Sequence, residues 1–343
     1  MAKAVVCSEH GLPDKLNLVH DWETPELGPN DVRMQVKAAG LNFPDVLIIQ
    51  GKYQMQPPMP FVPGGESAGV VTEVGSAVTR WSVGDSVIQL GGVGGFASEA
   101  VVNENALLPK PDGIDFTAAA GVGMTYFTSY YALKQRGQLK AGETMLVMGA
   151  AGGVGSTAVE LGKVMGARVI AAASSDEKLE LCKQLGADEV INYSNESMKD
   201  RIKEITGGKG VDVVYDPVGG DFAEPAVRSM AWNGRYLVIG FASGPIPSIP
   251  LNLTLLKGCA LVGVFWGRFL GEEPAEQQKN VEELWGLFND GKLNPVVTDV
   301  FPIEDYEAGY AAMMERRAKG KDIFTFAVMD GFSCHSVTTT LGP

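Results

Sequence analysis

The sequence has few of the residues that build metal sites and disulfides. Three histidines and four cysteines occur among 343 residues, and no two cysteines form a C-x-x-C pair. A three-histidine metal site would need every histidine in the chain, and neither a disulfide framework nor a cysteine-knuckle zinc site is indicated. Scattered free thiols are typical of a reducing compartment, so we expect a cytoplasmic protein. The seven residues are His10, His20, His335, Cys7, Cys182, Cys259 and Cys334.

Basic residues are also scarce relative to acidic ones. Lysine and arginine total 28 against 41 aspartate and glutamate residues, so the net charge is −13 and nucleic acid is not an expected partner. No apolar run reaches the roughly 18 residues of a membrane span, and residues 1–5 show no signal-peptide pattern, so no membrane partner is expected. Glycine is abundant instead, with 43 residues. Because glycine costs folding entropy, we expect it where the backbone requires it.

In the first third of the chain, glycines separate short β-rich segments. This spacing is typical of an antiparallel, partly barrel-like β-domain, and two small apolar helices, at 116–120 and 124–133, are expected to follow it. The predicted strands are 3–7, 31–38, 67–74, 86–89 and 99–102.

The pattern changes near residue 140, where apolar strands alternate with helices. Such alternation indicates a parallel sheet covered on both faces. The predicted strands are 144–148, 168–173, 189–191, 211–215 and 234–239, with the apolar run from Cys259 to Trp266 as the last strand. The predicted helices are 156–165, 176–185, 197–206 and 222–230. Helices at 275–289 and 304–315 and strands at 295–301 and 325–328 then return to the first domain.

A glycine-rich turn joins the strand at 144–148 to the helix after it. The turn reads Gly149-Ala150-Ala151-Gly152-Gly153-Val154-Gly155, an A-x-G-x-x-G pattern. Gly152 lets the backbone approach a pyrophosphate, and Gly155 lets the helix pack close to its strand. The helix N-terminus offers free N–H groups to the phosphates. Because the turn opens a long βαβ series, it favours dinucleotide binding, with Ala151, Gly152, Gly153, Val154 and Gly155 as contacts.

The end of the second strand favours NADPH over NADH. An NAD site places an acid there to bind the ribose 2′-hydroxyl, whereas this strand is followed by Ser174 and Ser175, and Asp176 lies past its end. The small hydroxyls leave room for a 2′-phosphate, Lys178 supplies charge, and Tyr193 can cover the phosphate or the adenine edge. Alternatively the serines only cap the next helix, and both interpretations can hold.

Several motifs together resemble a known superfamily. The segments PGGESAGVV (63–71), VG (74–75) and VGDSV (83–87) resemble the medium-chain dehydrogenase/reductases, and Asn42 with the 149–155 turn resembles their zinc-independent, zeta-crystallin-like NADPH:quinone oxidoreductase branch. The resemblance covers about residues 1–329. It implies an α/β fold in which a GroES-like, partly open β-barrel catalytic domain joins a Rossmann domain with a doubly wound parallel sheet. The expected ranges are 1–124 (catalytic), 125–264 (NADPH-binding), 265–329 (catalytic again) and 330–343 (a mobile tail).

The resemblance also identifies what this chain lacks. Zinc-dependent members have a cysteine where this chain has Asn42, a histidine at Gly65 and a third ligand near Met124. None of these three side chains can complete the usual N/S tetrahedron of zinc. Without a Lewis acid, substrates that accept hydride readily are favoured, namely quinones or alkenes conjugated to a carbonyl.

Two residues are candidates for the chemistry itself. Tyr53 resembles the tyrosine of related enoyl thioester reductases, which is held to donate a proton or hydrogen bond; a tyrosine packed at a loop edge is the alternative. Asn42 is expected to donate to the developing oxyanion or to contact the nicotinamide ribose, with Asp45 orienting it. An asparagine that makes only turn hydrogen bonds is equally consistent with the sequence.

Further residues are placed along the cofactor cleft by the resemblance. They are Thr125 and Thr128 on one helix, Phe241 after a strand, and Phe265 and Trp266. Packing is the alternative for each of them. Arg316, Arg317 and Lys321 can reach cofactor phosphates, although a solvated helix end is the favoured interpretation.

Three functions remain open at this point. The leading hypothesis is a metal-independent reductase of quinones or α,β-unsaturated carbonyls that uses NADPH. The alternatives are an enoyl-CoA or acryloyl-CoA-type reductase with little quinone activity, and a non-catalytic NADPH-binding protein. The run from Cys259 to Trp266 would leave an apolar sheet edge exposed, and in the family this edge pairs with its twin, so a homodimer is expected.

Overall fold

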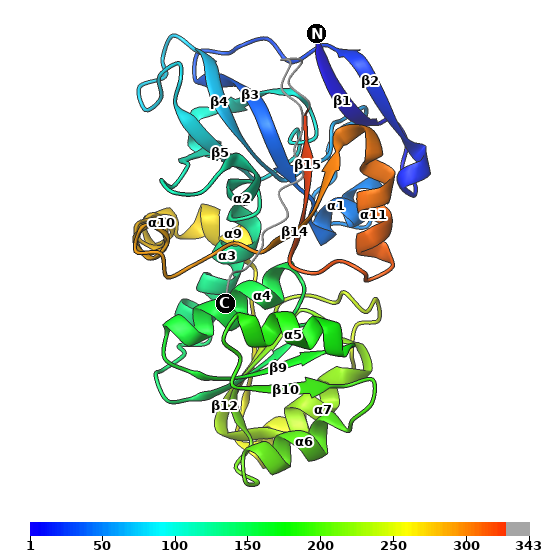
Figure 1. Ribbon diagram of the computed structural model, residues 1–343, viewed down its shortest axis with the longest axis vertical. Helices are drawn as coiled ribbons and strands as arrows, with labels where there is room; N and C mark the ends of the chain where they lie inside the picture. The colour runs from blue at the N-terminus through cyan, green and yellow to red at the C-terminus, as the bar shows by residue number, and fades with distance from the viewer. Residues whose placement is uncertain (327–343) are drawn as a thin grey trace, which may run out of the picture.

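The computed structural model describes residues 1–326, so the predicted tail at 330–343 lies outside the described residues. Two lobes are stacked along the long axis of the molecule (Figure 1). Both ends of the described chain lie in the upper lobe, and the middle of the chain forms the lower lobe. This arrangement confirms the expected combination of a GroES-like domain with a Rossmann domain.

The upper lobe is built on a mainly antiparallel sheet. Its strand order is β14-β15-β3-β4-β5-β7, with β6 paired to β3, while β1 and β2 form a separate pair. Pairing of Ile323 with Gly40 brings the last described strand into the N-terminal sheet. The strands are β1 (Ala2–Cys7), β2 (Leu16–Trp22), β3 (Asp31–Gly40), β4 (Glu66–Val74), β5 (Ser86–Leu90), β6 (Glu99–Asn103), β7 (Leu107–Pro109), β14 (Val297–Pro302) and β15 (Lys321–Thr325).

The lower lobe is a parallel sheet with helices on both faces. Its order is β10-β9-β8-β11-β12-β13, so the direction of winding reverses between β8 and β11. Alternate residues of β8 face opposite cores: Met145 and Val147 lie in one cluster, Leu146 and Met148 in the other. The strands are β8 (Thr144–Met148), β9 (Arg168–Ala173), β10 (Glu189–Asn192), β11 (Val211–Asp216), β12 (Met230–Val238) and β13 (Ala260–Gly263).

The helices divide between the two cores of the lower sheet and the upper lobe. Residues of α3, α4, α5, α9 and α10 pack on one face of the parallel sheet, those of α6, α7 and α8 on the other. In the upper lobe α1 and α11 cover the core. The helices are α1 (Phe43–Ile49), α2 (Phe116–Ala119), α3 (Gly123–Tyr131), α4 (Gly153–Val164), α5 (Asp176–Gln184), α6 (Met198–Ile205), α7 (Ala223–Arg228), α8 (Asn252–Lys257), α9 (Trp266–Glu272), α10 (Pro274–Asn289) and α11 (Tyr306–Met314). None of these helices is long and apolar enough to cross a membrane.

The structure corrects the expected strand from Cys259 to Trp266. The strand β13 covers only Ala260–Gly263, and α9 begins at Trp266. The chain leaves the sheet because the Trp266 ring packs in the core, stacked on Phe127 with centroids 6.0 Å apart, and its Nε1 donates to Gln277 Oε1 at 3.2 Å. Tertiary packing of one aromatic side chain therefore overrides the strand pattern of the apolar run.

A second correction concerns the C-terminal strand. It was expected at 325–328 and lies at Lys321–Thr325 instead. Lys321 and Asp322 are both almost fully buried within it. Buried charged residues are rare, so the hydrophobic pattern places the predicted strand several residues after the point at which the strand begins.

Candidate active site

The glycine-rich turn has the geometry of a phosphate-binding loop. It connects β8 to α4, whose N-cap is Gly152. Gly149 has a φ of +58°, and its carbonyl accepts from Gly152 N at 3.0 Å, which closes the turn. The N–H groups of the first turn of α4 have no partner within the helix, so they are available to an anion.

Gly155 and Gly152 are required for different reasons. A Cβ on Gly155 would lie 2.2 Å from Gly149 O and 2.8 Å from Ala150 Cα, so the helix can approach the strand only with glycine there. A Cβ on Gly152 would meet nothing closer than Gly149 O at 3.4 Å. Packing within the protein therefore does not demand glycine at 152, whereas close approach of a phosphate does. The residues present fit a dinucleotide at this turn.

A cationic cluster lies at the carboxyl end of β9. Lys178 Nζ donates to Arg316 O at 2.6 Å, and Lys319 Nζ donates to Glu177 Oε1 at 2.6 Å. We call Lys178, Arg316 and Lys319 the cationic cluster. Two of its members come from the segment after α11, more than a hundred residues away in sequence. Arg316 is exposed just after α11, as a solvated helix end would be, and its guanidinium donates to Ser243 O at 3.1 Å.

Electrostatic effects on Lys178 and Tyr193 agree with this convergence. Burial lowers the pKa of Lys178, and the charges of Lys319 and Arg316 lower it further. Burial raises the pKa of the Tyr193 hydroxyl, against the opposing effects of Ser174 and Arg316. Tyr193, Ser174 and the cationic cluster thus meet at one place, where a bound anion would offset the mutual repulsion of the cations.

The serines and the first acid after β9 have definite roles. Ser175 is the N-cap of α5, and its Oγ accepts from Lys178 N at 3.4 Å, so the capping interpretation holds for this residue. Ser174 is exposed. Asp176, the first acid after β9, accepts from Asn192 Nδ2 at 2.7 Å, so this carboxylate is already hydrogen-bonded within the protein.

The loop after β11 is organised by a residue that the sequence analysis did not single out. Asp216 is 2 % exposed, and its Oδ1 accepts from Val218 N at 2.7 Å and Gly219 N at 2.9 Å. Tyr236 donates to the other oxygen. Burial raises the pKa of Asp216. A Cβ on Gly219 would lie 2.8 Å from the Phe241 ring, so the predicted cleft residue Phe241 lies against this loop.

A buried polar cluster occupies the equivalent of the zinc site. Asn42 Nδ2 donates to Glu66 Oε1 at 2.9 Å and to Gly40 O at 3.3 Å. Lys321 forms an ion pair with Glu66 and donates to Asn42 Oδ1 at 2.5 Å. The other carboxylate oxygen of Glu66 accepts from Met124 N at 2.9 Å. We call Asn42, Glu66 and Lys321 the buried triad. Neither Glu66 nor Lys321 was assigned this role from sequence.

Asp45 lies beside the triad, and its charge acts on Tyr53. Its carboxylate accepts from Asn42 N at 2.8 Å and from Gly65 N at 3.2 Å. Burial raises the pKa of Asp45 to about 7, even though Asn42, Lys321 and Gly65 act to lower it. Tyr53 is half-buried against the upper core, and its pKa is raised by burial and then by the charge of Asp45, so the hydroxyl keeps its proton at neutral pH. Among residues 1–326, no three His, Cys, Asp or Glu side chains are grouped to hold a metal ion.

The remaining predicted cofactor residues divide into two groups. Thr125 lies against the phosphate turn, with its Cγ2 3.3 Å from a Cβ built on Gly153, and its hydroxyl donates to Gly121 O at 2.7 Å. Thr128 is half-buried on the same helix. Trp266 is buried in the core with Phe127, whereas Phe265 is 52 % exposed.

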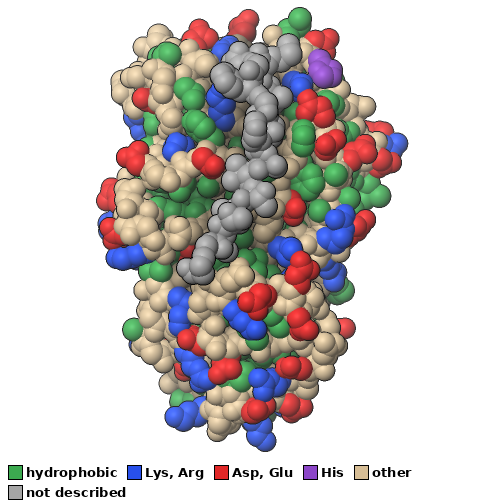
Figure 2. Space-filling model, in the orientation of Figure 1, with side chains coloured by type: hydrophobic (Ala, Val, Ile, Leu, Met, Phe, Trp, Pro, Cys, Tyr) green, Lys and Arg blue, Asp and Glu red, His purple; other side chains and the backbone are tan. Residues whose placement is uncertain are grey.

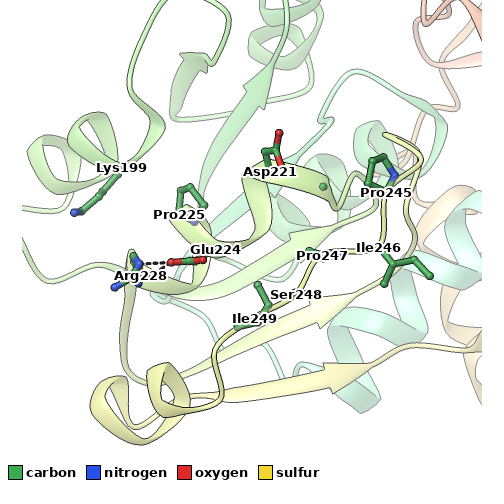
Figure 3. A pocket seen from close by; sticks show the side chains of 11 residues that line it. Lys199, Asp221, Glu224, Pro225, Arg228, Pro245, Ile246, Pro247, Ser248 and Ile249 are labelled. Carbon is green, nitrogen blue, oxygen red and sulfur yellow. Dashed lines mark hydrogen bonds and ion pairs between the residues drawn. The ribbon is translucent and has the colours of Figure 1, made fainter.

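A hollow on the surface of the lower lobe is separate from these groups. It measures about 450 Å³ and lies between α7 and residues 245–249 (Figure 3). Glu224 and Arg228 form an ion pair one turn apart on α7, and Lys199 lies near the Arg228 end of the hollow. None of its lining residues belongs to the phosphate turn, the cationic cluster or the buried triad. Acidic and basic side chains are interspersed over the face shown in Figure 2.

Two family models match the chain. The model described as "Alcohol dehydrogenase GroES-like domain" matches residues 28–112, and "Zinc-binding dehydrogenase" matches residues 153–286. The second span includes α4 and the strands after it and contains none of Asn42, Gly65 and Met124. The zinc in its description is therefore not supported by residues of this chain at those positions.

Individual relatives agree with the family models. A quinone oxidoreductase-like protein 2 homologue of Nematostella vectensis is 40 % identical over 322 residues, which are 93 % of this chain and 87 % of that protein. A quinone oxidoreductase of Pseudomonas aeruginosa is 36 % identical over 324 residues, 94 % and 99 % of the two chains. The crystal structure of Escherichia coli quinone oxidoreductase complexed with NADPH matches with a TM-score of 0.88 at 29 % identity, covering 95 % and 100 %. The chain therefore belongs to the quinone oxidoreductase family of the medium-chain dehydrogenase/reductase superfamily.

Proposed function

We propose that this protein is a metal-independent oxidoreductase that transfers hydride from NADPH to a quinone or an α,β-unsaturated carbonyl compound. The observation that carries the proposal is the cationic cluster at the end of β9, adjacent to a glycine turn that fits a pyrophosphate. Family membership supports the same class of reaction, because the similar Escherichia coli enzyme was solved with NADPH.

The choice of NADPH rests on charge at the adenosine end of the site. Lys178, Arg316 and Lys319 supply positive charge, and Ser174 with Tyr193 supplies hydroxyls. The carboxylate that would suit a ribose 2′-hydroxyl, Asp176, is engaged by Asn192. A 2′-phosphate fits this environment better than a free hydroxyl does.

The class of acceptor follows from the side chains of the buried triad. An amide, a carboxylate and an ammonium there already satisfy one another, and the ammonium can only donate hydrogen bonds. This donor set does not suit a zinc ion that would polarise a simple ketone. Quinones and conjugated alkenes accept hydride without that help, so they are the proposed substrates.

Tyr53 is the proposed hydrogen-bond or proton donor. The nicotinamide supplies the hydride when NADPH is bound. A quinone that takes up a hydride becomes a hydroquinone anion, and one proton completes the hydroquinone; a conjugated carbonyl takes hydride at its β-carbon, and one proton completes the saturated product. Because its pKa is raised, Tyr53 retains the proton that such an oxygen anion needs. The chain's contribution is to orient the reactants and stabilise the developing negative charge.

The test is NADPH consumption against a panel of acceptors. We expect saturable turnover with a small quinone, an enone or an enoyl-CoA, and none with a saturated ketone. Tyr53→Phe lowers turnover and leaves NADPH affinity nearly unchanged. An enoyl-CoA preference with little quinone turnover would select the second hypothesis, whereas tight NADPH binding without reduction of any acceptor would select the non-catalytic one and refute the proposal.

Association into a homodimer is part of the proposal. β13 is an edge strand of the parallel sheet, and edge strands have unpaired backbone groups. Large apolar side chains of the same region are exposed, among them Trp232, Leu255, Leu256 and Leu261. We expect a dimer in light scattering, and a monomer for the Leu255→Glu/Leu256→Glu variant. A wild-type monomer at high concentration would refute this part.

A further inference from the structure

The orientation of the Asn42 carboxamide is fixed by three partners of known polarity. An ammonium only donates hydrogen bonds, whereas a carboxylate and a backbone carbonyl only accept them. The oxygen of Asn42 must therefore face Lys321, and its two hydrogens must face Glu66 and Gly40 O. Both hydrogens of the carboxamide are engaged, so its remaining capacity is the second lone pair of Oδ1. Asn42 is 8 % exposed.

The fold is shaped around the Lys321 side chain. A Cβ on Gly40 would lie 2.8 Å from Lys321 Cε, and a Cβ on Gly121 would lie 2.9 Å from Lys321 Cγ. At Gly121 the Lys321 stem is the nearest neighbour, whereas at Gly40 a Cβ would also lie 2.3 Å from Ala120 O and 2.7 Å from Glu66 Oε1, so both glycines keep the space that the stem occupies clear. Lys321 itself is 5 % exposed. Burial of an ammonium group without partners would cost much free energy, so the partners of Lys321 are needed for the lysine to be buried here.

The segment 316–321 joins the two ends of the proposed cofactor site. It begins in the cationic cluster at Arg316, and Gly320 N donates to Ala151 O of the phosphate turn at 2.7 Å. It ends at Lys321, which lines a narrow hollow together with Gly153 and Thr125. A dinucleotide with its 2′-phosphate at the cluster and its pyrophosphate at the turn would extend its nicotinamide riboside toward Asn42.

We infer that Lys321 is a positioning residue, which holds Asn42 as a hydrogen-bond acceptor for a hydroxyl of the nicotinamide riboside. The inference rests on the proposed function and deepens it. It assigns a direction to the Asn42 contact: the carboxamide accepts from the cofactor and does not donate to the substrate oxyanion. That donation is left to Tyr53. Lys321 acts only through Asn42, so its effect disappears when Asn42 is removed.

Calorimetric titration with two probes tests the inference without relying on turnover. NADPH reports on both halves of the site, and adenosine 2′,5′-bisphosphate reports on the adenosine half alone. For Lys321→Met we expect the Kd of NADPH to rise about tenfold, which corresponds to loss of one hydrogen bond, and the Kd of the bisphosphate to stay the same. For Arg316→Met, five residues earlier, the Kd values of both probes rise.

A double-mutant comparison tests the route of the effect. Asn42→Ala/Lys321→Met should bind NADPH as Asn42→Ala does, because the lysine acts through the amide. Removing one partner of a buried ion pair can prevent folding, so Lys321→Met/Glu66→Gln, which neutralises both charges, serves as a second variant with the same expected split.

Several results would overturn the inference. Equal weakening of both probes by the Lys321 variants would indicate a general structural role, and unchanged binding of both would show that the triad does not contact the cofactor. If Asn42→Ala/Lys321→Met binds NADPH clearly more weakly than Asn42→Ala does, Lys321 acts by another route. If the wild-type protein binds NADPH no more tightly than it binds the bisphosphate, the contact to the nicotinamide riboside is absent. If it binds neither probe, the proposed function fails as well.

Discussion

Replacing Arg316 by methionine removes one charge from the cationic cluster while keeping a long side chain. Arg316 has a φ of +59°, and methionine leaves that backbone strain unchanged. The guanidinium donates to Ser243 O at 3.1 Å, and the backbone carbonyl of residue 316 accepts from Lys178. The substitution therefore removes the guanidinium charge but keeps the backbone contact that positions Lys178.

The size of the effect follows from exposure. A hydrogen bond to a charged group contributes about 1.5–3 kcal/mol, but Arg316 is exposed, so solvent screens its interaction with a phosphate. We therefore expect a loss just below that range, about 1.4 kcal/mol, which is about tenfold in affinity. The loss should appear for NADPH and not for NADH, because NADH has no 2′-phosphate.

The assay is a fluorescence titration of the wild type and the variant with both cofactors. Arg317→Met is the matched control: Arg317 is a neighbouring exposed arginine that pairs with Glu315 at 2.7 Å. We expect about a tenfold weaker NADPH affinity for Arg316→Met and no change for Arg317→Met. Equal weakening of NADH and NADPH, or wild-type preference for NADH, would refute the assignment of the cationic cluster to the 2′-phosphate.

Two further predictions concern the turn and the buried carboxyl group. Gly155→Ala should lower the free energy of unfolding by about 1–3 kcal/mol, and with it the melting temperature, because the methyl group would meet Gly149 O at 2.2 Å. Gly152→Ala should fold normally and bind NADPH at least about tenfold more weakly. Normal binding by Gly152→Ala would contradict the phosphate assignment. The pKa of Asp45 is raised from its usual 3.8 to about 7, so between those values the native protein binds more protons than the unfolded chain, and stability falls as the pH rises. Asp45→Asn should flatten that slope in urea unfolding, and an unchanged slope would show that Asp45 titrates normally. Some slope remains because burial also raises the pKa of Asp322, to about 6.

The phosphate turn was predictable because its signal is local. A strand, seven turn residues and a helix follow one another in sequence, and Gly149 and Gly155 have backbone reasons within that stretch. The positions of Asn42, Gly65 and Met124 were also found from motifs, and the structure brings them together around Glu66 and Asp45.

The contacts that sequence reasoning could not select, including those of Arg316 and Lys321, join distant segments. Arg316 and Lys319 reach α5 across about 140 residues, and Lys321 reaches Asn42 across 279. A lysine or arginine near a helix end has the same local pattern whether it is solvated or paired. Trp266 was assigned to a strand because its apolar neighbours continue the pattern, and only its packing on Phe127 ends the strand.

The most direct test of the account is the rate of NADPH oxidation by a small quinone, measured before and after exhaustive dialysis against a metal chelator, with NADH in parallel. The account predicts saturable turnover, a kcat/KM for NADPH at least about tenfold above that for NADH, and no change on dialysis. Activity that is lost on chelation and restored by zinc, or equal use of both cofactors, would contradict it.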